Sequence, residues 1–163
     1  MCLIVNKENC NAKVAEKDII CYKLMYGYKD DISNGIRIIT PYQLQVLPFN
    51  KTIVAEGRAT KYPDDDDANQ KLIGQGVIHS YSTLDGAMDD MIGFGDGNII
   101  FKAIIPKGTK YYVGDFDGTP AYGSKKLIIT DVIVGTRFDC EYPEEEAVVD
   151  YLYDNYKVDC CIE

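Results

Sequence analysis

The chain has 163 residues, enough for one domain that buries roughly 70% of its unfolded surface without a disulfide or a metal. Acidic residues outnumber basic ones by 26 to 17, and the net charge of −9 opposes direct binding to nucleic acid. No apolar run approaches ~18 residues and no secretory leader opens the chain, which predicts a cytoplasmic protein without a membrane segment. The six cysteines follow no zinc or redox spacing, so we expect reduced thiols.

Short apolar stretches predict strands in the first third of the chain. The first covers Met1–Val5 and the second Ile19–Met25. A turn at 30–35 should let residues 36–39 pair back as a hairpin arm, and residues 51–55 predict a short edge strand.

Residues 62–72 predict a mobile loop, because the four consecutive aspartates at 64–67 repel one another. The run lacks the alternating oxygen ligands, glycine and terminal glutamate of a calcium loop, so we expect no metal site there.

The middle of the chain, residues 74–134, organises the predicted fold. A half-buried strand at 77–81 leads into a helix at about 83–92, capped by Ser82. The following strand, 99–105, is apolar on nearly both faces, as a central strand should be, and a last strand covers 127–134.

A second helix is predicted at about 143–155, because Pro143 suits a first helical position and three glutamates follow it. Its apolar face could dock on the sheet or on a second copy of the chain, giving a homo-oligomer; the residues are Val148, Tyr151, Leu152 and Tyr156. The expected fold is therefore one α+β domain over 1–163, with a twisted mixed or antiparallel sheet of five to seven strands.

Candidates for catalysis are few. His79 is the single histidine, but a histidine in an apolar strand is more often a packed, hydrogen-bonded residue. Ser80 points to the opposite strand face and cannot pair with it. Removal of Met1 would leave Cys2 as an N-terminal nucleophile of the amidohydrolase kind, although glycines and an asparagine for an oxyanion site are missing nearby. We therefore predict no catalytic residue, no metal site and no cofactor.

Aromatic side chains at strand ends give the predicted binding site. Thirteen tyrosines and no tryptophan are present, and a phenol at a strand end can offer its hydroxyl to a partner. The residues assigned to this site are Tyr22, Tyr42, His79, Tyr81, Tyr111 and Tyr112.

Five segments resemble a group of small uncharacterised bacteriophage and prophage proteins: Met-Cys-Leu at the start, Ile-Cys-Tyr-Lys at 20–23, Thr-Pro-Tyr at 40–42, and the stretches 76–87 and 105–112. More distantly, the glycine–strand–helix–alanine order resembles the second half of the ADP-ribosyltransferase fold, whose strands wall an NAD cleft. Gly76 and Ala87 match that pattern. The catalytic glutamate is missing, since residues 123–126 read Gly-Ser-Lys-Lys, and Cys21–Lys23 lacks the first-strand motif.

These features predict a non-enzymatic phage accessory protein that acts by binding in the host cytoplasm. Its partner would be a host or defence protein with a basic surface, which it inhibits, or a small nucleotide signal, which it sequesters. The alternatives are a divergent NAD-dependent ADP-ribosyltransferase-like enzyme with His79 and Tyr81 in its cleft, and an N-terminal-cysteine amidohydrolase that uses Cys2.

Overall fold

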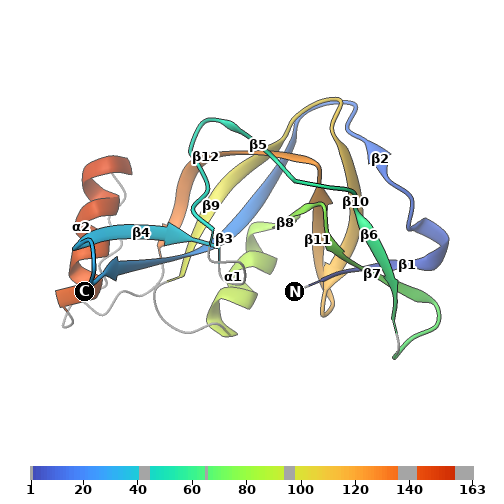
Figure 1. The fold of residues 1–163 in the computed structure, drawn as a ribbon, viewed down its shortest axis with the longest axis horizontal. Helices are drawn as coiled ribbons and strands as arrows, with labels where there is room; N and C mark the ends of the chain where they lie inside the picture. Colours follow the sequence, from blue (N-terminus) through green and yellow to red (C-terminus); the bar gives the residue numbers. More distant parts are fainter. Residues whose placement is uncertain (1, 41–44, 65, 94–97, 136–142, 157–163) are drawn as a thin grey trace.

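The computed structural model describes residues 2–40, 45–64, 66–93, 98–135 and 143–156. Within these ranges twelve strands form one sheet, accompanied by two α-helices (Figure 1). The α+β class is as predicted, but the sheet has more strands than the five to seven expected. All ladders between named strands are antiparallel in the described part of the chain.

The elements follow one another along the chain with short connections. The strands are β1 (Leu3–Asn6), β2 (Lys13–Val14), β3 (Ile19–Asp30), β4 (Gly35–Ile39), β5 (Thr52–Val54), β6 (Thr60–Pro63), β7 (Gln70–Gln75), β8 (Ile78–Tyr81), β9 (Asn98–Ile105), β10 (Lys110–Phe116), β11 (Thr119–Ser124) and β12 (Lys126–Gly135). The helices are α1 (Leu84–Gly93), α2 (Pro143–Tyr156) and a short 3-10 helix, η1 (Lys7–Asn9).

Strand β9 is central, as its sequence predicts. It pairs with β12 on one side and β3 on the other. Its side chains alternate between two apolar cores: Ile99 and Phe101 belong to one, which also contains the apolar face of α2, while Ile100 belongs to the other, which contains Ala87 of α1. Because both faces of β9 are covered, an uninterrupted apolar run is the stable sequence for it.

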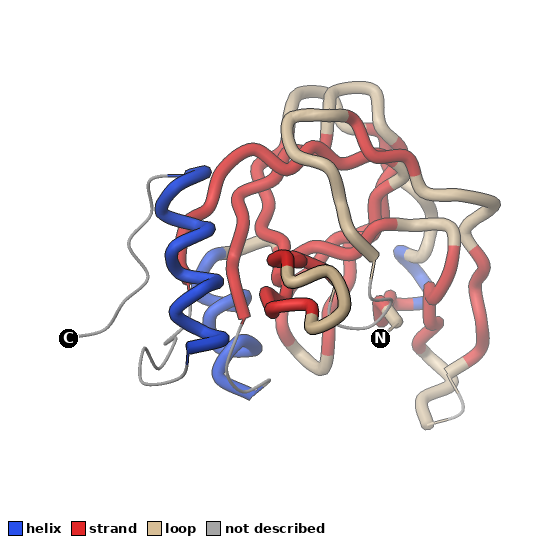
Figure 2. Tube along the Cα trace, turned by 60° about the vertical axis from the view of Figure 1, so that its left-hand side comes forward, coloured by secondary structure: helices blue, strands red, loops and turns tan. Residues whose placement is uncertain are grey.

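The sheet must be strongly curved. Its order is β5-β12-β9-β3-β8-β11-β10-β1-β7-β6, so the two end strands, β5 and β6, follow each other in the sequence. Ten strands laid flat would span ~43 Å at the usual strand spacing. The link at residues 55–59 reaches only ~20 Å when extended. The ends of the sheet are therefore drawn together, and Figure 2 shows the strands running round a nearly closed outline.

One lysine holds this closure. The Lys125 ammonium donates hydrogen bonds to the carbonyl oxygens of Ala55 at 2.8 Å, of Gly76 at 3.0 Å and of Gly57. Two of these acceptors lie in the link between β5 and β6, and Gly76 lies in the β7–β8 turn. Lys125 thus joins the junction of β11 and β12 to both connections.

The hairpin of β10 and β11 was not predicted. Its turn is Asp117-Gly118, with φ angles of 48° and 90°, the left-handed backbone that a tight two-residue hairpin turn requires. Gly114 in β10 has no room for a side chain, since a Cβ there would lie 2.0 Å from the Ile4 carbonyl oxygen of β1. The Asp-Gly pair was the sequence signal for this hairpin.

Three local expectations need correction. Thr83, not Ser82, caps α1 by accepting a hydrogen bond from the Gly86 N–H, while the Ser82 hydroxyl donates to the Pro120 carbonyl. Met88 was placed in the buried stripe of α1 but is 36% exposed. Both ends of the loop expected at 62–72 belong to strands, β6 and β7, which pair with each other.

Helix α2 packs its apolar face on its own chain. Val148, Val149 and Leu152 are buried in the core that contains Phe101 (Figure 1). Oligomerisation through this helix remains a prediction. None of the helices in the described ranges combines the length and apolar character needed to span a bilayer.

Candidate functional site: a pocket where the sheet divides

The sheet divides between β3 and β8. These strands share a single register pair, Tyr22 with Tyr81, whereas β3 and β9 share a ladder along Ile19 to Tyr26. Beyond that pair the two strands separate, and a side chain takes over the pairing. The Lys23 ammonium donates a hydrogen bond to the backbone carbonyl oxygen of His79 at 2.7 Å.

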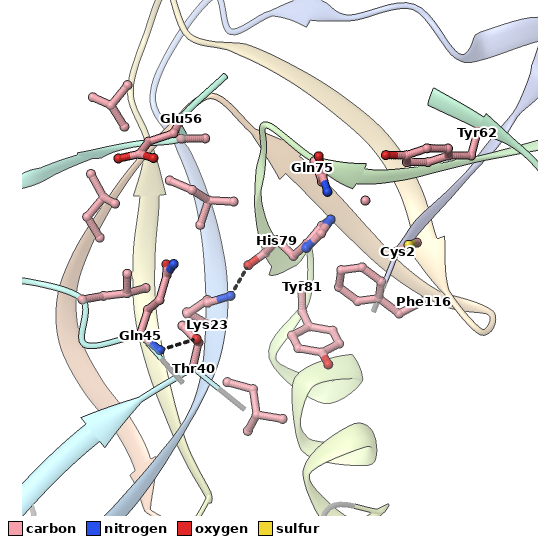
Figure 3. A pocket seen from close by; sticks show the side chains of 17 residues that line it. Cys2, Lys23, Thr40, Gln45, Glu56, Tyr62, Gln75, His79, Tyr81 and Phe116 are labelled. Atoms are coloured by element: carbon pink, nitrogen blue, oxygen red, sulfur yellow. Dashed lines mark hydrogen bonds between the residues drawn. The ribbon is translucent and has the colours of Figure 1, made fainter. Parts of the chain in front are cut away.

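A pocket of about 740 Å³ opens at this division (Figure 3). One wall comes from β3, β5 and residues 40–47, and the other from β7, β8 and β10. Its polar lining residues are Cys2, Lys23, Thr40, Gln45, Glu56, Tyr62, Gln75, His79 and Tyr81, and its apolar ones include Leu24, Leu47, Ile53, Val54, Ile78 and Phe116.

Lys23 is an unusual residue for its position. Along β3, Ile19, Cys21 and Met25 point to the core that contains Phe101, and Lys23 lies on the same face between them. Burial lowers the pKa of Lys23 from 10.5 to about 8. The one ion pair in the described part of the chain joins Arg37 to Asp30, so Lys23 has no carboxylate partner there.

His79 lies on the opposite wall as a neutral ring. Its Nε2 is 3.2 Å from the Ile73 carbonyl oxygen, which can only accept, so Nε2 carries the proton. The ring packs edge-on against Phe116, with centroids 5.4 Å apart. Burial and the positive charge of Lys23 lower the pKa of His79 to about 4. This histidine is a packed, hydrogen-bonded residue whose remaining edge faces the pocket.

The structure brings together only some of the predicted site residues. His79 and Tyr81 line the pocket, and Tyr81 packs edge-on against Phe116 at 5.3 Å. Tyr22 packs against the core that contains Ala87. The other tyrosines of β10 also lie outside the lining: Tyr111 packs edge-on against Tyr122, and Tyr112 lies under the Lys61 ammonium. Tyr42 falls outside the described residues.

The cysteines have different surroundings. Cys2 is exposed and lines the pocket, whereas Cys21 is buried and its pKa is raised by burial to about 11, which keeps its thiol protonated. Cys2, Cys10 and Cys21 are free thiols, and the other three cysteines lie outside the described ranges. No group of three or more His, Cys, Asp or Glu side chains in those ranges could hold a metal ion.

Sequence reasoning missed Lys23 although a signal was present. A lysine in the middle of an otherwise apolar strand face is costly to bury, and such residues gather at functional sites. Thr40, Gln45 and Gln75 carried no such signal, because they reach the pocket only through the curvature of the sheet. Comparison with protein-family models, curated proteins and solved structures gives no match to this chain.

Proposed function

We propose that the protein binds and sequesters a small molecule of nucleotide size in the pocket between β3 and β8, without converting it. The observation that carries the proposal is the pocket itself: its volume of about 740 Å³ lies within the range of small-molecule sites. It combines apolar walls with a few polar groups, which is the composition typical of ligand recognition.

The chemistry of the lining supports binding over catalysis. His79 is neutral, and its ring proton is engaged by the Ile73 carbonyl. The glutamate used by ADP-ribosyltransferases is missing from the strand junction at 123–126. Sequestration of a nucleotide signal, one of the two modes of binding expected from the sequence, therefore fits this pocket best.

The test blocks the pocket with a bulky side chain. Val54 lines it and is 57% exposed, so Val54→Trp should fill it; Val113, 41% exposed on β10 and outside the lining, provides the matched control as Val113→Trp. A panel of nucleosides, mononucleotides and cyclic nucleotides is titrated by calorimetry. We expect at least about tenfold weaker binding for Val54→Trp only. If no panel compound binds, or if both variants bind like the unmodified protein, the proposal fails.

An N-terminal-cysteine amidohydrolase is the second candidate, because Cys2 is exposed within the pocket lining. Its α-amino group could then act as the base. The intact mass of the protein purified from its natural host decides the matter, since a retained Met1 excludes this mechanism.

A further inference from the structure

The Lys23 ammonium is a partly satisfied cation at the wall of a pocket. An ammonium has three N–H donors, and the described residues supply one acceptor, the His79 carbonyl. Thr40 and Gln45 lie on the same side of the pocket as Lys23 (Figure 3). The Thr40 hydroxyl accepts a hydrogen bond from the Gln45 backbone N–H at 3.1 Å, which fixes this segment beside the lysine.

An unpaired charge in such a place is energetically unfavourable. Taking an ammonium out of water costs several kcal/mol unless an opposite charge compensates it, by general estimates of about that size. The chain carries 26 acidic residues, and none forms an ion pair with Lys23 in the described ranges. A carboxylate at this point would be the simple stabilising solution. Its absence leaves the countercharge to be supplied from outside the chain.

We propose that Lys23 anchors an anionic group, a phosphate or a carboxylate, of the molecule bound in the pocket. The inference rests on the proposed function and deepens it, because it specifies that the ligand is an anion and where its charge lies. The two remaining N–H donors of Lys23 bind the anion, and the side-chain amide of Gln45 is placed to donate beside them. The apolar side chains Ile53 and Ile78 are left for the uncharged part of the ligand.

The lowered pKa supports this placement. An opposite charge close to an ammonium restores the protonated form, so a bound anion should raise the pKa of Lys23 from about 8 by about one unit or more. The other titratable groups around it are Cys21 on the same strand, His79 and Tyr81 on β8, and Cys2, Glu56 and Tyr62 in the pocket lining. NMR of 13C-labelled lysine reads Lys23 directly and separates its titration from theirs.

The experiment has two parts. In the first, the pKa of Lys23, assigned by its loss in Lys23→Met, is measured without and with inorganic phosphate or succinate. We expect either anion to raise it, and the stronger effect tells phosphate from carboxylate recognition. An unchanged pKa with both anions overturns the inference.

In the second part, AMP and adenosine are compared in the unmodified protein, Lys23→Met and Val54→Trp. AMP should bind at least about tenfold more tightly than adenosine, and this preference should vanish in Lys23→Met. If the two bind equally and both need an open pocket, ligand binding stands and the anion anchor fails. If phosphate raises the Lys23 pKa but no panel compound binds, the anchor stands and the proposed function fails.

Discussion

Replacing Lys23 by methionine should stabilise the protein near neutral pH and destabilise it in alkali. The pKa of Lys23 falls from 10.5 to about 8 on folding, so between these values the unfolded chain binds more protons and stability rises with pH. At about pH 7, where both states are charged, this difference lowers the free energy of unfolding by ~3 kcal/mol. The variant escapes that loss, but leaves the His79 carbonyl without its charged donor, at a cost of about 2 kcal/mol.

The net effect of Lys23→Met is then a gain of about 1 kcal/mol near pH 7 and a loss of about 1 kcal/mol near pH 9.5, where ~2 kcal/mol of the wild-type deficit has been recovered. Urea titrations of both proteins across this range measure it. Lys126→Met, which removes an exposed lysine from β12, is the control and should show no such trend. A difference between Lys23→Met and the unmodified protein that stays constant with pH would refute the view that Lys23 is desolvated.

Three further predictions concern residues that hold the pocket walls. Lys125→Met should lower the free energy of unfolding by about 3 kcal/mol, because it leaves three carbonyl oxygens without their donor; a change in urea titrations below about 0.5 kcal/mol would contradict the closure role. His79 has a pKa lowered from 6.5 to about 4, so the protein should lose about 3 kcal/mol of stability as the pH falls through that interval, and His79→Gln should abolish this loss; acid titrations followed by circular dichroism compare the two, and parallel curves would argue against a buried neutral ring. Gly114→Ala should cost about 3 kcal/mol through its clash with the Ile4 carbonyl, whereas Gly108→Ala, at φ 80° with open space around it, should cost about 1 kcal/mol in thermal melts; equal costs would mean that β1 and β10 are not in close contact.

The sequence by itself determined the elements whose stability depends on neighbouring residues. The apolar run of β9 required cover on both faces, the turn at 30–35 joined β3 to β4, and Pro143 marked the start of α2. The Asp117-Gly118 turn was also readable, although the hairpin it forms was overlooked. These features are local because strand alternation and turn geometry act over a few residues.

Only the tertiary structure decided where the pocket lies. Lys23 and His79 are 56 positions apart, and they meet because β3 and β8 part after a single pair. Val54 and Gln75 line the same pocket because a short link forces the ends of the sheet together. Strand order and curvature depend on the packing of the whole chain, so strand periodicity can place Lys23 on a face but cannot say that the face opens into a pocket.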